Sequence, residues 1–347
     1  MLRFLTAGES HGEALVGILE GMPAGMKVDV SDINKELERR QFGYGRGQRM
    51  QIEHDRAKIL SGLIRGVTIG SPIAVLIKNK DFSIDKLPAV KNPRPGHADM
   101  AGVLKYGFND ARYVLERASA RETAARVSIG AICKILLEEF NMSITSRVLM
   151  IGGAKSEKSI KDKINEAVKS KDTLGGVFEV VVKGAPPGLG SCVHWDKRLD
   201  AGIAEAIMSI PAIKGVEIGN AMECSSKFGS EVHDEIFYSK EKGIYRNTNN
   251  AGGIEGGMSN GEDIIARGYM KPISTLMDGL KSIDIDTKKP AKASAERSDV
   301  CAVSAAGVVG EAMMAFVISK AFLEKFGGDS IAEIKRNHKG YILGLKI

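Results

Sequence analysis

Two of the six histidines in this chain stand in short loops that combine glycine with charged or polar residues. His11 lies in the segment 8–12, GESHG, and His97 lies in the segment 94–99, RPGHAD. Neither loop offers apolar neighbours against which an imidazole could pack. Imidazole gives or takes a proton near neutral pH, and adjacent glycines let the backbone approach a ligand closely. The two histidines are therefore predicted to be acid or base groups, or ligand contacts.

Arginines gather in the same parts of the sequence. A guanidinium group matches the oxygens of phosphate and carboxylate in a two-point geometry, so a shared pocket for an anion is the favoured interpretation. A solvated basic face remains the alternative for the first of the two groups. The first group is Arg39, Arg40, Arg46 and Arg49, and the second, near other candidate residues, is Arg94, Arg117, Arg121 and Arg297.

Composition excludes several other classes of protein. The net charge of +6 is compatible with nucleic acid, but aromatic residues make up only 5% of the chain, too few for a stacking surface. The four cysteines include no Cys-x-x-Cys pair, so we expect a reduced, cytoplasmic protein without a metal site. No Walker loop or dinucleotide fingerprint occurs. We expect no signal peptide and no membrane span, since the most apolar stretch, 300–322, contains Glu311 and Lys320 and is predicted to be a buried helix.

Hydrophobic periodicity predicts a mixed α and β chain in which the candidate loops join regular elements. The expected helices cover 32–40, capped by Ser31, 119–140 and 200–210, and the expected strands cover 66–78, 177–182 and 214–218. Prolines in 82–99 and glycines in 247–261 predict irregular segments there.

One short internal echo links the two predicted buried helices. The segment 117–122, RASARE, precedes the first, and the segment 292–299, KASAERSD, precedes the second. The echo suggests two similar halves, each with a helix N-terminus that favours an anion. Asp299 alone would be a simple N-terminal cap of the second helix.

Taken in order, these segments resemble the chorismate synthase family over nearly the whole chain. The segments that carry the resemblance are 8–12, 39–47, 94–99, 118–123, 187–190, 214–219, 271–275 and 297–299. The resemblance implies an α+β fold, a β-α-β sandwich with buried central helices and an internal pseudo-repeat. It also implies one domain over 1–347, in a homotetramer.

The same resemblance implies a reaction. Chorismate synthases convert 5-enolpyruvylshikimate 3-phosphate to chorismate by an anti-1,4-elimination of phosphate and the C6 proton, the last step of the shikimate pathway to aromatic amino acids. They are carbon-oxygen lyases that need reduced FMN without net redox change, because the flavin lends an electron transiently and its N5 takes the proton. Whether this member reduces its own flavin with NAD(P)H or depends on an external reductant stays open.

By similarity, the site residues fall into three groups. The catalytic group is His11, His97, Asp299, Ser10 and Ser119; the substrate-binding group is Arg40, Arg46, Arg49, Arg94 and Arg121; the FMN-binding group is Ala118, Ser119, Ala120, Gly256, Lys271, Pro272, Ile273, Ser274, Thr275 and Arg297. Arg40 and Arg46 are alternatively contacts to a nucleotide such as NADP. Ala118 departs from the pattern, since many members have serine there.

The resemblance also assigns roles. His11 is expected to protonate the departing phosphate, and His97 to stabilise the reduced flavin as an imidazolium. Asp299 is expected to be the base that keeps N5 ready for the proton, while Ser10 and Ser119 order the local hydrogen bonds. Two alternatives remain: a basic RNA-binding or scaffold protein, and a different flavin-dependent lyase acting on a phosphorylated polyol acid.

Overall fold

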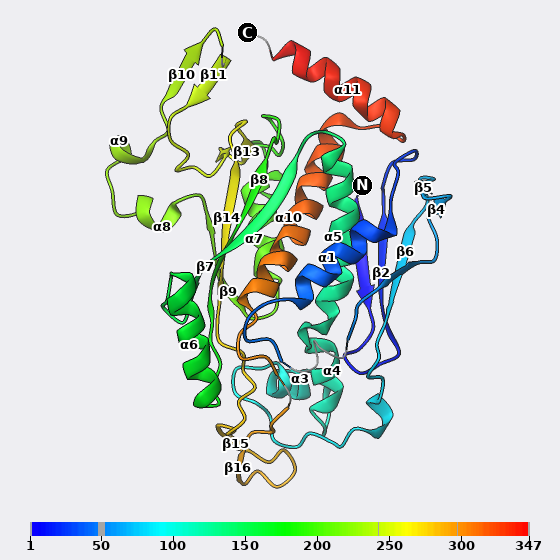
Figure 1. Cartoon of the computed structure of the whole chain (residues 1–347), viewed down its shortest axis with the longest axis vertical. Helices are drawn as coiled ribbons and strands as arrows, with labels where there is room; N and C mark the ends of the chain where they lie inside the picture. The colour runs from blue at the N-terminus through cyan, green and yellow to red at the C-terminus, as the bar shows by residue number, and fades with distance from the viewer. Residues whose placement is uncertain (1, 48–52, 242, 297, 346–347) are drawn as a thin grey trace.

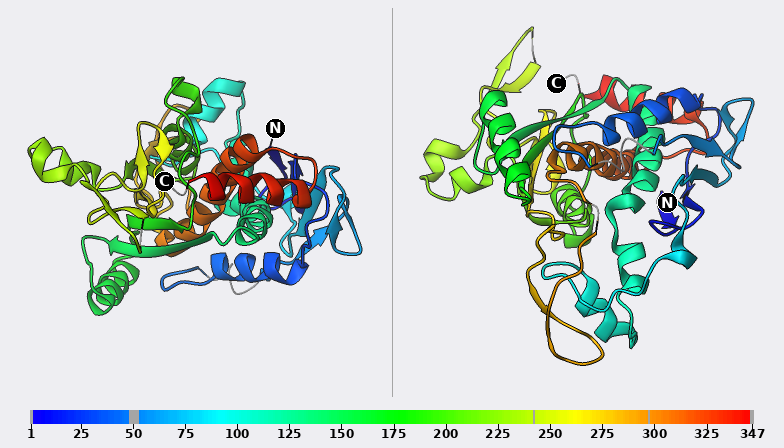
Figure 2. Two further views of the ribbon diagram at one scale, coloured as in Figure 1. Left: turned by 90° about the horizontal axis from the view of Figure 1, so that it is seen from above. Right: turned by 60° about the horizontal axis from the view of Figure 1, so that its bottom comes forward.

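Two antiparallel four-stranded sheets enclose two long helices in the computed structural model, which describes residues 2–47, 53–241, 243–296 and 298–345 (Figure 1). The first sheet has the order β1 (Arg3–Ala7), β2 (Ala14–Glu20), β6 (Ile73–Lys78), β3 (Ala57–Ile59). The second has the order β7 (Ser143–Ile151), β8 (Gly176–Lys183), β14 (Ile264–Met270), β9 (Ile213–Ile218). Helices α5 (Thr123–Glu138) and α10 (Val303–Phe326) lie between them, as the view from above shows (Figure 2). The predicted sandwich with buried central helices is confirmed.

The two halves of the chain repeat one topology. Within each sheet, the strands taken in chain order are arranged first, second, fourth, third. In each half a helix joins the second and third strands, α1 (Val30–Gln41) in the first and α7 (Leu199–Met208) in the second, and a long helix follows the fourth. The echo at 117–122 and 292–299 stands before the two equivalent helices, so the predicted pseudo-repeat is confirmed at the level of topology.

Helices α5 and α10 pack at very short distance because small residues face each other. Gly130 lies against Ala312 so closely that a Cβ on Gly130 would stand 2.3 Å from the Ala312 Cβ. Phe178 of β8 fills the space beside Gly310, so the helix pair also fits tightly against the second sheet. α10 is long and apolar enough to cross a membrane, but most of it is buried inside the fold, as expected for a core helix.

Three predicted elements need correction. Asp29, not Ser31, caps α1, because its carboxylate accepts the Ser31 backbone N–H at 2.8 Å. The strand expected over 66–78 is split into β5 (Val67–Thr68) and β6, since Gly70 at φ +79° and Pro72 interrupt it. The helix expected from residue 119 begins with a 3-10 turn, η2 (Ala120–Glu122), before α5.

The remaining elements lie outside the two sheets and the two central helices. At the lower end in Figure 1 lie η1 (Ile84–Lys86), α3 (Asp99–Tyr106), α4 (Arg112–Ala118), β15 (Lys281–Ile283) and β16 (Pro290–Lys292). Val90, Val103, Ala111, Leu115 and Ile285 give this end a small apolar core of its own. The others are β4 (Leu63–Ile64), α6 (Glu157–Lys169), η3 (Trp195–Lys197), α8 (Ala221–Cys224), α9 (Gly229–Val232), β10 (Ile236–Ser239), β11 (Gly243–Arg246), β12 (Ile254–Glu255), β13 (Met258–Ser259) and α11 (Ile331–Gly344).

The close helix crossing predicts a large effect of one methyl group. Gly130→Ala should lower the free energy of unfolding by about 1–3 kcal/mol, because the new Cβ overlaps Ala312 in a packed core. Gly340→Ala is the matched control, because Gly340 is exposed on α11 and a Cβ there would meet no described atom within 4 Å. Since alanine is more favourable than glycine inside a helix, this change should raise the free energy of unfolding by roughly 0.5–1 kcal/mol. Urea unfolding of both variants measures the difference, and equal stabilities would contradict the packing argument.

Candidate active site

His11 is fixed by a carboxylate that the sequence pattern does not indicate. Its backbone N–H donates to Oε2 of Glu116 at 2.8 Å, and its ring Nδ1 lies 3.0 Å from both carboxylate oxygens. The Ser10 N–H donates to the Glu116 carbonyl at 2.9 Å. Gly8 permits this loop, since its φ is +104° and a Cβ there would stand 2.3 Å from the Ala14 carbonyl oxygen. Strand β1, the loop and α4 thus hold His11 in one position.

His97 has a similar carboxylate partner in the stiff turn that precedes α3. Its Nδ1 pairs with the Asp99 carboxylate and lies 3.0 Å from Nη2 of Arg94. Arg94 in turn donates from Nε to Asp99 at 2.8 Å and from Nη1 to the Thr275 hydroxyl at 2.8 Å. Burial would raise the pKa of the Asp99 carboxyl, but hydrogen bonds from His97 and Arg94 outweigh burial and hold that pKa below its ordinary value.

A third carboxylate, Asp55, pairs with two buried arginines, Arg40 at the end of α1 and Arg121 in η2. Asp55 lies 2.8 Å from Nη1 of Arg121 and 3.5 Å from Nη1 of Arg40. Arg40 also donates to the Thr123 hydroxyl at 2.9 Å and to the Ala120 carbonyl at 3.0 Å. Burial, with the neighbouring cations Arg121 and Arg46 adding to it and Asp55 opposing it, lowers the pKa of Arg40 to about 10.

Asp299 holds the glycine loop that follows α1. It accepts the Gly47 N–H at 2.5 Å and pairs with Nη1 of Arg46 at 2.8 Å. The interpretation of Asp299 as a helix cap is wrong, because α10 begins at Val303 after Ala302 and has no side-chain cap. Its carboxylate is used to bring residues 46–47 of the first half against the second half.

The segment 271–275 lies beside the His97 turn. A Cβ on Gly96 would stand 3.6 Å from the Ser274 Cβ and 3.8 Å from Nζ of Lys271. Burial, with a contribution from Lys214, lowers the pKa of Lys271. Pro272 and Ile273 complete the segment. Ser119 lies two residues before Arg121, and its hydroxyl accepts the Arg121 backbone N–H at 3.3 Å.

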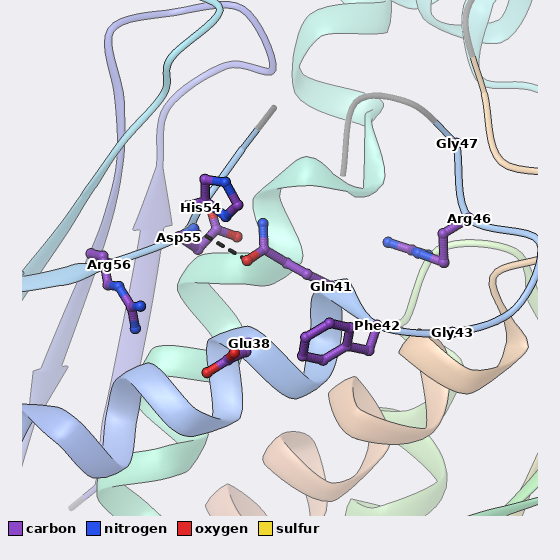
Figure 3. A pocket seen from close by; sticks show the side chains of 9 residues that line it. All are labelled: Glu38, Gln41, Phe42, Gly43, Arg46, Gly47, His54, Asp55 and Arg56. Atoms are coloured by element: carbon purple, nitrogen blue, oxygen red, sulfur yellow. Dashed lines mark hydrogen bonds between the residues drawn. The ribbon is translucent and has the colours of Figure 1, made fainter. Parts of the chain in front are cut away.

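A cavity of 530 Å³ opens between the end of α1 and the start of β3 (Figure 3). Its lining is Glu38, Gln41, Phe42, Gly43, Arg46, Gly47, His54, Asp55 and Arg56. The Arg46 side chain is 9% exposed, and its Nε has no hydrogen-bond acceptor among the described residues. A buried guanidinium nitrogen without an acceptor suits an anionic ligand. His54, whose sequence context indicates only a structural or surface role, is exposed at this cavity.

The predicted site residues are thus brought together only in part. Asn79 joins the His11 loop to Arg121, because it donates to the Gly12 carbonyl at 2.7 Å and accepts from Nε of Arg121 at 3.0 Å. Arg121 and Arg40 share Asp55, and Arg40 interacts electrostatically with Arg46 and Asp299. Ser298, next to Asp299, donates to the Thr275 carbonyl, and the Thr275 hydroxyl accepts from Arg94 beside His97. Ser10 and 118–120 adjoin these contacts.

Gly256 lies in the turn between β12 and β13, where a Cβ on it would stand 3.9 Å from the Cys192 Cβ, and no described contact joins this turn to the residues above. Strand β13 is in the upper part of Figure 1. Arg49 and Arg297 lie outside the described residues. Within the described part of the chain, no cluster of His, Cys, Asp or Glu is placed to hold a metal ion.

Comparison with known proteins identifies one family over nearly the whole chain. The family model described as chorismate synthase matches residues 2–323. A chorismate synthase of Thermoanaerobacter pseudethanolicus is 55% identical over 348 residues, covering 99% of each chain. One of Caldanaerobacter subterraneus subsp. tengcongensis is 56% identical over 344 residues, covering 98% of each. A crystal structure of chorismate synthase superposes with a TM-score of 0.82 at 42% identity, covering 99% of this chain and 98% of the other.

The buried Asp99 pair predicts a pH-dependent loss of stability. Asp99→Asn should lower the free energy of unfolding at pH 7 by about 3–5 kcal/mol, because it leaves Arg94 buried without its counter-ion. The pKa of Asp99 is depressed in the fold, so its contribution is complete above the unfolded value of about 3.9 and shrinks as pH falls below it. Urea unfolding between pH 3 and 7 should show that the difference in free energy of unfolding between the unaltered chain and Asp99→Asn is constant near neutrality and becomes smaller in acid. A difference that grows in acid would contradict this account.

Proposed function

The chain belongs to the chorismate synthase family, and from this premise we propose that it catalyses the anti-1,4-elimination of phosphate and the C6 proton from 5-enolpyruvylshikimate 3-phosphate to give chorismate. The reaction makes it a carbon-oxygen lyase at the last step of the shikimate pathway. The observation that carries the proposal is that two carboxylate-paired histidines lie close to four carboxylate-paired arginines, Arg40, Arg46, Arg94 and Arg121. Hydrogen bonds of Asn79 and Thr275, and the electrostatic interaction of Arg40 with Arg46 and Asp299, connect these pairs.

The substrate explains why so many arginines are held in place. A phosphate and two carboxylates can be buried only against paired cations, because desolvating an isolated charge is very costly. A guanidinium carries five N–H donors, so Arg94 or Arg121 can keep its carboxylate partner and still bind a substrate oxygen. Arg46 has a buried Nε that suits such an oxygen.

The residues near His97 fit a flavin phosphate and its polar ring edge. Lys271 and Ser274 stand against Gly96, and the Thr275 hydroxyl is linked to Arg94. We propose that this segment, 118–120 and Arg297 hold FMN, whose reduced form supplies a transient electron for C–O cleavage when bound. The resemblance assigns Gly256 to the same group, but its place at the β12–β13 turn gives that assignment no support within one chain.

The chain's own residues then divide the proton chemistry. His11 gives a proton to the departing phosphate, with Ser10 ordering its loop. His97 brings an imidazolium to the flavin side of the pocket, and Ser119 orders the donors near Arg121. The Asp299 carboxylate, next to Arg46, is the base that would keep N5 of bound FMN able to accept the C6 proton. The family further suggests a cytoplasmic homotetramer of single-domain chains, with reduced flavin from an external reductant or from NAD(P)H.

His11→Gln should lower kcat by about 10²- to 10⁴-fold, the contribution of one general acid. Binding of substrate should change little, because the arginines remain. Chorismate absorbance and phosphate release under anaerobic conditions measure turnover. His194→Gln, at an exposed position of the same residue type, is the control and should keep full activity. Undiminished turnover in His11→Gln would remove His11 from this role.

Asp299→Asn should retain FMN binding but slow turnover by about 10²-fold or more, because the amide cannot take up a proton. Flavin fluorescence titration and steady-state turnover separate these two effects. Asp286→Asn, on the exposed β15–β16 hairpin, should change neither. Turnover equal to that of the unaltered chain would leave Asp299 only its role of holding the glycine loop.

The proposed function as a whole is tested by incubating the protein anaerobically with 5-enolpyruvylshikimate 3-phosphate and dithionite-reduced FMN. Chorismate should form with reduced FMN and not with oxidised FMN. A folded protein that forms none would favour another ligand, such as the substrate of a different flavin-dependent lyase. Retention of polynucleotide with a steep salt dependence would instead favour the RNA-binding alternative.

A further inference from the structure

Glu116 contacts the loop of His11 at more points than orientation of a backbone turn requires. Its carboxylate accepts the His11 N–H and lies 3.0 Å from the ring Nδ1, while its carbonyl accepts the Ser10 N–H. The glutamate is 3% exposed, so the contact is shielded from water. A ring that is held at both its backbone and Nδ1 has little freedom to rotate.

Glu116 is itself held as an anion. Arg112, one helical turn earlier on α4, stands 3.4 Å from Oε1 and is anchored by the Pro88 carbonyl and by Glu296. Burial would raise the pKa of Glu116, but hydrogen bonds from the His11 side chain and backbone outweigh burial and lower it. The carboxylate therefore accepts hydrogen bonds throughout the neutral range and does not donate.

An acceptor at Nδ1 decides which tautomer the imidazole adopts. A neutral imidazole has one N–H, and the hydrogen bond made by one nitrogen sets the state of the other. Facing a carboxylate, Nδ1 must carry the hydrogen. Only Nε2 can then gain or lose a proton during catalysis.

Other charged groups stand on the elements around the His11 loop. Glu9 is in the same loop, and its carboxylate lies against Gly12. Ile84 donates its N–H to the His11 carbonyl, and the segment around Ile84 also contains acidic and basic residues. On the described elements next to the loop these groups are Glu9, Asp81, Asp85, Lys86, Arg112, Glu116, Arg117 and Glu296. The ring nitrogen Nδ1 has its described polar contact with Glu116.

We infer that Glu116 is a positioning residue that fixes His11 in the Nδ1–H tautomer, so that Nε2 is the atom that delivers the proton to the departing phosphate. The inference rests on the proposed function. In each turnover the Nε2–H bond of the imidazolium breaks, its proton passes to the phosphate oxygen that leaves C3, and the neutral Nδ1–H ring remains. A proton from solvent restores the imidazolium.

The tautomer is measured first, because it does not depend on turnover. Ring nitrogen shifts of ¹⁵N-histidine-labelled protein, with His11 assigned by its absence from His11→Gln, should show Nδ1–H in the neutral ring of the unaltered chain. Glu116→Gln should give a mixture or the Nε2–H form. Glu116→Asp should preserve Nδ1–H in part. An Nε2–H ring in the unaltered chain, or an unchanged tautomer in Glu116→Gln, would overturn the inference.

Kinetics then test the consequence. Glu116→Gln should lower kcat by about 10²- to 10⁴-fold, the range for one proton-transferring group, with KM changed only a few-fold, and Glu116→Asp should recover part of the loss. The matched control is Glu179→Gln, which removes another buried, arginine-paired carboxylate far from His11 and should change neither the tautomer nor kcat.

The two measurements separate this inference from the proposed function. If the unaltered chain makes no chorismate, the proposed function fails while the tautomer experiment still decides whether Glu116 controls the ring. If chorismate forms and Glu116→Gln has an altered tautomer but unchanged kcat, the proposed function stands and the positioning role fails. If Glu116→Gln lowered kcat no more than the control Glu179→Gln does, that result would also count against the positioning role of Glu116.

Discussion

The site depends on one constraint: a buried guanidinium needs a buried carboxylate. Asp55, Asp99 and Glu116 meet this need for the buried arginines of the site, and the partly exposed Asp299 pairs with Arg46. Three of these carboxylates also tie an irregular segment to a helix: Glu116 of α4 holds the His11 loop, Asp99 of α3 holds the turn at Arg94, and Asp55 connects its own loop to α1. The guanidinium groups are thereby held in position before an anion binds, which reduces the reorganisation energy that binding and catalysis require.

The sequence predicted those parts of the molecule that follow from local pattern. Hydrophobic periodicity identifies the strands β6, β8 and β9 and both buried helices, but it does not identify the central strands β2 and β14. The glycine-flanked histidines and clustered arginines identify the loops that meet. Glu116 and Asp55 were missed because their importance comes from partners far along the chain, such as His11 for Glu116. The burial of Glu53 and Asp55, which alternate with exposed His54 and Arg56, likewise depends on the distant Arg121.

Errors at the ends of elements have the same origin. Asp299 has the residue type and position of a helix cap, but a contact with Gly47, 252 residues earlier, claims its carboxylate. The split of the strand expected over 66–78 was readable from Gly70 and Pro72, which carry a conformational signal of their own. Gly256 illustrates the opposite limit, since membership of a motif does not determine which residues become neighbours in space.

The repeated strand order has a consequence for how the site is built. Each half taken alone would leave the apolar face of its long helix exposed, and in the whole chain α5 and α10 cover these faces for each other. The repeat of topology does not extend to the side chains of the site. His11, His97 and Glu116 come from the first half, and Thr275 and Asp299 come from the second. A nearly symmetric framework thereby carries an asymmetric set of functional groups.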